Sequence, residues 1–134
     1  MAVAAEPGLA VDPMKGLGTD VVDLDRFRLA LARTPRLRER LFTAGERAVA
    51  DARRDPIPAL AVRFAAKEAV MKALGVGLGA FAWHDVEVER ATSGRPTLNI
   101  TGTAATLAAE AGVTAWHLSL SHSDLVAMAV VAAD

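Results

Sequence analysis

Apolar and polar residues alternate at both ends of the chain, which is the pattern of strands that bury one face. Near the start, residues 17–22 (LGTDVV) place Gly18 and Asp20 on one face and their neighbours on the other. Near the end, residues 116–132 alternate over a longer stretch and predict two strands that turn at residues 122–124 (HSD). The chain is therefore expected to begin and end in strands.

Helical periodicity follows the first strand. A helix of residues 24–32 is expected there, and Thr43-Ala-Gly-Glu46 fits a capping box, which marks a second helix start. The sequence DPIP at 55–58 is a clear break. A longer helix of residues 58–74 should come next, because proline suits a first helical turn and Gly75 suits a helix end.

Two strand-like segments, residues 85–90 and 97–101, are joined by a turn region, TSGRP at 92–96. The alanine-rich residues 102–111 are helical by propensity. The predicted order is β-α-α-α-β-β-α-β-β, which describes a single α+β domain.

Composition excludes several classes of protein. An apolar share of 52% and a charged share of 23% predict a folded chain, and 134 residues suit one core. A net charge of -1 gives no basic footprint for nucleic acid, and an aromatic share of 4% argues against base stacking. The absence of cysteine excludes disulfides and thiolate metal sites and is compatible with a cytoplasmic protein.

Neither end of the chain predicts a membrane segment. Residues 1–14 have no basic region and no unbroken apolar region, so they suggest a flexible leader ahead of a domain of residues 15–134. The longest apolar run, residues 125–133, is far too short to span a bilayer. We expect neither nucleic acid nor a membrane to be a partner.

The predicted helix of residues 58–74 sets charges among apolar neighbours. At about 100° per residue, a small face that could pack closely on a sheet consists of Val62, Ala66, Ala69 and Ala73. The charges form two stripes of residues four apart, Arg63 with Lys67 and Glu68 with Lys72. Phosphate chemistry needs a carboxylate for a metal, ammonium groups for phosphate oxygens and apolar walls that strengthen both.

Taken alone, this helix is more simply interpreted as amphipathic, with Glu68 and Lys72 as a weak surface ion pair. Lysine usage favours phosphate binding, because the only lysines among 15 basic residues are Lys15, Lys67 and Lys72. Asp20, if buried in its apolar strand, needs a partner such as a metal ion, an arginine or a helix N-terminus. One strand carboxylate and one helix carboxylate, completed by water and phosphate oxygens, commonly hold Mg²⁺.

A series of segments resembles a known family. In order they are GLGTDVVDLDRF, LFTAGE, RFAAKEAVMKALGVGLG, DVEVERATSGRPTL and HLSLSHSDLVAMAVV, and they span Gly16 to Val131. This series is similar to the holo-[acyl-carrier-protein] synthases, the small bacterial type of 4′-phosphopantetheinyl transferase. The resemblance implies that family's fold, a single α+β domain with an antiparallel sheet and a long site-bearing helix.

The resemblance also implies an activity, the transfer of 4′-phosphopantetheine from coenzyme A to a serine of apo acyl carrier protein, which leaves 3′,5′-ADP. It implies that Asp20 and Glu68 bind Mg²⁺, or Mn²⁺ in its place, and that Lys72 binds the coenzyme A phosphates. Glu68 would act as the base and Lys72 would stabilise the leaving group. Further residues near the nucleotide would be Arg63, Lys67, Gly75, His122 and Ser123. A homotrimer with active sites at subunit interfaces is also implied.

Arginines gather between residues 26 and 40, where only Glu39 offsets them: Arg26, Arg28, Arg33, Arg36, Arg38 and Arg40. Such a patch is either an ordinary solvated face or a docking surface that attracts an acidic protein in a salt-dependent way. Acyl carrier proteins are acidic, so the resemblance favours docking, with Arg26 and Arg28 as the predicted contacts. Carriers of fatty acid and of polyketide synthesis would both suit this surface.

Two other functions use the same features. A coenzyme A-dependent acyltransferase would share the nucleotide contacts but need no metal, and a non-catalytic carrier-protein adaptor would bind without turnover. A hydrolase is a weaker alternative, because the chain lacks a G-x-S-x-G sequence, and the strand neighbours Ser121 and His122 should point to opposite faces.

Overall fold

The computed structural model describes residues 13–134, and these form the α+β fold that the sequence predicts. The elements are β1 (Gly16–Asp23), α1 (Leu24–Arg33), α2 (Leu37–Leu41), α3 (Ala44–Asp51), α4 (Ile57–Leu74), the 3₁₀ helix η1 (Trp83–Asp85), β2 (Val86–Arg90), β3 (Pro96–Ile100), α5 (Gly102–Glu110), β4 (Trp116–His122) and β5 (Val126–Ala133). Most of the predicted leader, residues 1–12, lies outside the described residues.

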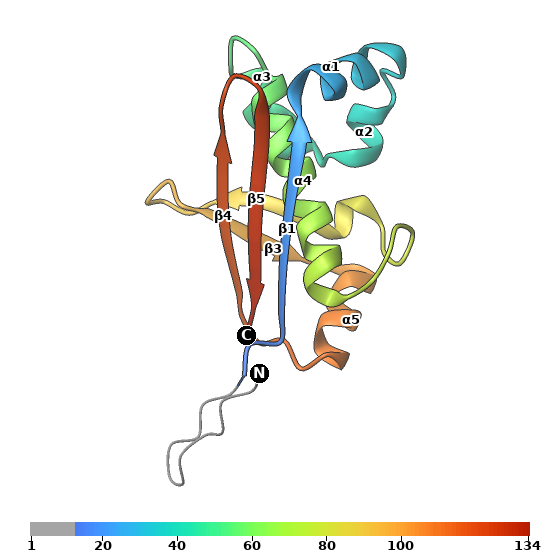
Figure 1. Cartoon of the computed structure of the whole chain (residues 1–134), viewed down its shortest axis with the longest axis vertical. Helices are drawn as coiled ribbons and strands as arrows, with labels where there is room; N and C mark the ends of the chain where they lie inside the picture. Colours follow the sequence, from blue (N-terminus) through green and yellow to red (C-terminus); the bar gives the residue numbers. More distant parts are fainter. Residues whose placement is uncertain (1–12) are drawn as a thin grey trace, which may run out of the picture.

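The strands form two antiparallel sheets. One has the order β1-β5-β4 and the other is the hairpin of β2 and β3. In Figure 1 the three long strands run side by side with α4 behind them, α1, α2 and α3 gather at one end, and α5 lies towards the other end. The central strand β5 therefore separates β1 from β4, so side chains of β1 and side chains of β4 lie at opposite edges of this sheet.

Two details of the predicted order are wrong. The sequence pattern predicts no helix between residues 33 and 43, yet α2 forms there because Leu41 is buried and Leu37 packs on the core. Asp85 was expected to begin a strand but ends η1, since its carboxylate accepts the backbone N–H of Ala104 at 3.2 Å and caps α5.

Helix α4 packs against the three-stranded sheet through the small face that its sequence predicts. A Cβ atom added to Gly18 would lie 1.9 Å from the carbonyl oxygen of Ala69, and one added to Gly16 would lie 1.9 Å from that of Ala73. Only glycine in β1 permits backbone contact this close. The close packing predicted for the small face is confirmed.

The predicted helix ends are confirmed as well. Thr43 and Glu46 form both bonds of the capping box at the start of α3. Gly75 ends α4 in the left-handed region at φ 69°.

Among residues 13–134, no helix has the length and apolar character needed to cross a membrane.

Candidate functional site

The candidate site lies where β1 crosses α4 and brings together Asp20, Glu68 and Lys72. Asp20 lies two residues beyond Gly18 on the same face of β1, and its side chain is only 15% exposed. The Nζ of Lys72 donates to Asp20 Oδ1 at 3.0 Å and to the Thr19 carbonyl at 2.9 Å. Glu68 lies one turn before Lys72 on α4. The three residues expected to be catalytic therefore meet in one place.

The electrostatics of Glu68 show how close the two carboxylates are. Burial raises the pKa of the Glu68 carboxyl above its usual value, the charge of Asp20 raises it further, and Lys72 acts in the opposite direction. A divalent cation would remove this repulsion. Within residues 13–134 no third His, Cys, Asp or Glu completes a metal cluster. The donor set thus fits a Mg²⁺ ion whose remaining ligands are water and substrate phosphate rather than protein.

A largely apolar cavity of about 590 Å³ lies beside Glu68. Aromatic rings form one wall: Phe27 packs on Phe64 at 5.6 Å between centroids, and Phe64 stacks on Trp83 at 5.4 Å. Leu78, from the glycine-rich loop after α4, also lines it. Apolar walls beside a carboxylate lower the local dielectric constant, which strengthens its interaction with other charges.

A second cavity, of about 230 Å³, is strongly basic. Arg53, Arg63 and Arg90 line it together with His122 at the end of β4. Arg63 is only 2% exposed, and its Nη1 donates to the Ala59 carbonyl at 2.8 Å. The Nε of Arg63 has no hydrogen-bond partner among the described residues. Three arginines and a histidine around one cavity would favour an anion there.

Burial also shapes the electrostatics of Arg63. It lowers the pKa of this residue; among the neighbouring charges Glu46 has the largest effect and raises the pKa, while Arg90 and Arg53 lower it.

The group of Asp20, Glu68 and Lys72 and the basic cavity lie at opposite edges of the three-stranded sheet. Asp20 belongs to β1 and His122 to β4, and β5 lies between these strands. Since neighbouring strands are about 4.8 Å apart, β1 and β4 are roughly 10 Å apart. Arg63 and Glu68 also point in different directions, because five residues correspond to about 140° around a helix.

Lys67 does not belong to either cluster, which corrects its predicted contact with the nucleotide. Its side chain is fully buried, and its Nζ pairs with Glu46 Oε1 at 2.8 Å. The same atom donates to the carbonyls of Trp83, at 3.1 Å, and Val86. With all of its donors used inside the protein, Lys67 cannot reach a ligand.

Gly75 and Ser123 have clear local roles. Gly75 ends α4, three residues after Lys72. Ser123 shapes the turn between β4 and β5, because its Oγ accepts the backbone N–H groups of Leu125 at 3.2 Å and Val126 at 3.3 Å. That turn follows His122 and so holds the edge of the basic cavity in place. Nucleotide contacts for Gly75 and Ser123 stay predictions.

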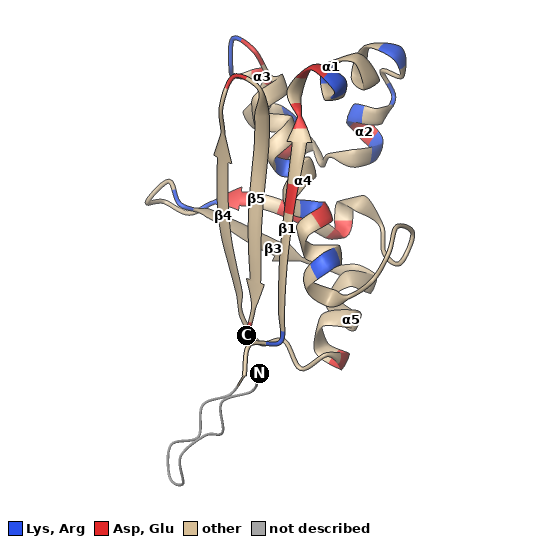
Figure 2. Ribbon diagram, in the orientation of Figure 1, with Lys and Arg blue, Asp and Glu red and all other residues tan. Residues whose placement is uncertain are grey.

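The two arginines predicted to bind a carrier differ in their surroundings. Arg28 pairs with both carboxylate oxygens of Asp55, at 3.1 and 2.7 Å, and this pairing raises the pKa of Arg28 and lowers that of Asp55. Arg26 is exposed on α1 and forms no ion pair with any other residue of the 13–134 range. Figure 2 shows several basic positions along the ribbon of α1 and α2. Of the two predicted contacts, Arg26 is the one whose guanidinium remains available.

Sequence reasoning missed Arg53 and Arg90 as members of the basic cavity and Glu46 as the partner of Lys67. Arg53 lies before the DPIP break and Arg90 ends β2, and neither position carries a motif. Glu46 did carry a signal, since it is the last residue of the capping box, but a capping box does not predict a buried ion pair.

Residues 16–131 match the family described as the 4′-phosphopantetheinyl transferase superfamily. The holo-[acyl-carrier-protein] synthase of Frankia casuarinae is 55% identical over 119 residues, which cover 89% of this chain and 96% of that protein. The enzyme of the same name from Streptomyces avermitilis is 54% identical over the same shares.

Solved structures agree with this match. The holo-[acyl-carrier-protein] synthase of Neisseria meningitidis superposes with a TM-score of 0.83 at 29% identity, covering 91% of this chain and 99% of that one. The Bacillus anthracis synthase in complex with CoA (3′,5′-ADP) gives a TM-score of 0.74 at 33% identity, covering 90% and 96%. Because family, relatives and fold agree over nearly all of the described residues, this chain belongs to the 4′-phosphopantetheinyl transferase superfamily.

Proposed function

We propose that this chain transfers the 4′-phosphopantetheine group of coenzyme A to a serine of an apo acyl carrier protein, giving the holo carrier and 3′,5′-ADP. The convergence of Asp20, Glu68 and Lys72 where β1 crosses α4 carries the proposal. Two carboxylates and an ammonium group are what metal-assisted phosphoryl transfer uses. The relatives named holo-[acyl-carrier-protein] synthase support the same pair of substrates.

In this reaction the side chains act on the attacking and the departing oxygen atoms. Glu68 accepts the proton of the carrier serine as its oxygen attacks the phosphorus that bears the pantetheine. Lys72, whose side chain is 53% exposed, donates to the departing phosphate as negative charge grows there. A Mg²⁺ or Mn²⁺ ion held by Asp20 and Glu68 would supply further charge neutralisation at the pyrophosphate.

The basic cavity suits the nucleotide end of coenzyme A. Arg63 and His122 were expected near the nucleotide, and Arg53 and Arg90 add charge beside them. A phosphate in this cavity would be held by the charges of these arginines. On the carrier side, exposed Arg26 offers an acidic protein a charge that no other described residue neutralises.

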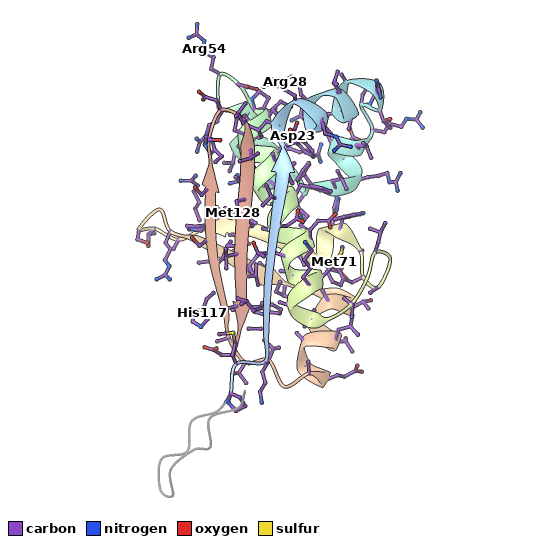
Figure 3. The ribbon with its side chains drawn as sticks, in the orientation of Figure 1. Asp23, Arg28, Arg54, Met71, His117 and Met128 are labelled. Atoms are coloured by element: carbon purple, nitrogen blue, oxygen red, sulfur yellow. The ribbon has the colours of Figure 1, made fainter. Side chains whose placement is uncertain are left out.

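We infer further that the chain assembles as a homotrimer, with each active site between two copies. The outer face of the sheet supports this, since Leu17, Val21 and Met128 are 61%, 59% and 39% exposed, and Val21 and Met128 are paired across β1 and β5 (Figure 3). Exposed apolar patches of this kind mark association surfaces.

The assembly is tested by Met128→Lys, measured by light scattering at the working concentration. We expect the wild-type chain to have the mass of a trimer, and the variant to have a smaller mass and little turnover. A monomeric wild type with full activity would contradict the shared site.

The reaction itself is tested by analysing all products formed from apo carrier and Mg²⁺ with coenzyme A and, in parallel, with acetyl-coenzyme A. The proposal requires 3′,5′-ADP in the same amount as modified carrier, and no product when EDTA removes the metal. An acyltransferase would release free coenzyme A without 3′,5′-ADP, and an adaptor would release neither.

A further inference from the structure

The ion pair of Lys67 and Glu46 is a fully enclosed charged group that the proposed reaction does not use. The two residues are 0% and 1% exposed. Besides its bond to Glu46, the ammonium of Lys67 holds the carbonyls of Trp83 and Val86, which lie at the two ends of the η1 turn. A charge enclosed this completely is expensive unless it is fully bonded, as this one is.

Glu46 extends the connection to two more elements. Its Oε1 also accepts the backbone N–H of Thr43 at the start of α3, at 3.0 Å. Its Oε2 accepts the backbone N–H of Val88 in β2, at 3.0 Å. Since Lys67 lies in the middle of α4, the pair ties α3, α4, η1 and β2 together at one point in the core.

Two residues next to the Lys67–Glu46 pair, Glu68 and Trp83, belong to the candidate site. Glu68 follows Lys67 directly along α4. Trp83, whose carbonyl Lys67 holds, stacks on Phe64 and forms with it a wall of the cavity that Glu68 lines. We propose that Lys67 and Glu46 are a positioning pair, which fixes Glu68 on α4 relative to the Trp83 wall. This role rests on the phosphopantetheinyl transfer proposed above.

The stability of the fold does not by itself explain why Lys67 and Glu46 form a buried ion pair. The attraction between two buried charges about offsets the loss of their hydration, so apolar residues of similar shape can often replace them without loss. Helix α4 is buried on almost every side, and apolar packing alone tolerates small rotations and shifts of a helix. Directional hydrogen bonds from Lys67 to two carbonyls allow much smaller rotations and shifts of the helix. Such precision matters because a small displacement of a catalytic base lowers turnover strongly.

The test compares the double variant Lys67→Met/Glu46→Gln with the wild type. Removing both charges leaves no uncompensated ion, and glutamine still suits a capping box. We expect cooperative unfolding near the wild-type melting temperature, a kcat lower by about tenfold or more, and a KM for coenzyme A within about threefold, because the basic cavity is built from other residues. Val70→Ala, a cavity-forming change at another buried position of α4, is the matched control and should lower stability without lowering kcat.

A well-folded double variant with the wild-type kcat would overturn the positioning role. If the double variant does not unfold cooperatively, Glu46→Asp, which keeps both charges but shortens the carboxylate's reach, decides: a lower kcat at an unchanged KM supports the role, and an unchanged kcat refutes it. Turnover of the wild type, measured first in the same assay, separates the two proposals. Without 3′,5′-ADP from the wild type the proposed function fails, and the positioning role fails with it.

Discussion

The contact between Gly18 and α4 makes the sharpest prediction, because it sets the distance between the carboxylates of β1 and α4. The Cβ of Gly18→Ala would lie 1.9 Å from the Ala69 carbonyl oxygen and 2.8 Å from the backbone nitrogen of Ala73. An ordinary contact is about 3.4 Å, so β1 must move away from α4 by about 1.5 Å. Both neighbours are backbone atoms of a buried helix, which cannot turn aside as a side chain would.

This displacement has two measurable consequences. Forcing an extra methyl group into a packed core costs about 1–3 kcal/mol in the free energy of unfolding, and a backbone clash belongs at the upper end. Asp20 is only two residues away and moves with the strand, and a shift of about 1 Å at a reacting group lowers turnover by roughly 100-fold. Urea unfolding measures the first effect and formation of holo carrier at saturating substrates measures the second.

The matched control is Gly77→Ala, since a Cβ at Gly77 meets no atom within 4 Å and the backbone there is not left-handed. We expect this control to keep wild-type stability and kcat. If Gly18→Ala keeps both as well, close packing of β1 on α4 does not position the site, and the geometric argument is wrong.

Three further predictions follow from the charges. In the metal-free protein Glu68 should bind its proton at a higher pH than an ordinary glutamate, because burial and the charge of Asp20 raise its pKa; Asp20→Asn should lower that pH, and an NMR titration of the Glu68 carboxyl that the variant leaves unmoved would contradict the coupling. Arg26→Glu should raise the KM for carrier by about tenfold and leave that for coenzyme A unchanged, with the effect weaker at high salt, and equal loss of both would refute a carrier-specific role. Arg63→Gln should raise the KM for coenzyme A by about tenfold or more, whereas Arg54→Gln, at an exposed position that projects from the fold (Figure 3), should not, and equal values for both variants would exclude the basic cavity as the nucleotide site.

Features that depend on neighbouring residues could be predicted from the sequence. The capping box of Thr43 and Glu46 needs only residues three apart. The approach of β1 to α4 was predictable because the small face of the helix and Gly18 each leave room for the other.

Features that depend on distant residues could not be predicted in the same way. Arg63 and Lys67 lie in one stripe of α4 and look alike in the sequence, yet one lines a cavity and the other is enclosed by Glu46, η1 and β2. Arg28 likewise forms an ion pair with Asp55, and α2 and α3 separate these two residues in the sequence. What each charge does is decided by the elements that cover it, and local periodicity carries no information about those.

The most direct test of the central claim is the intact mass of an apo acyl carrier protein after incubation with this chain, coenzyme A and Mg²⁺. The proposed reaction predicts a gain of one phosphopantetheine group on a single serine, with no gain for Glu68→Ala. An unchanged carrier mass for the wild type, despite measurable binding of coenzyme A and carrier, would contradict it.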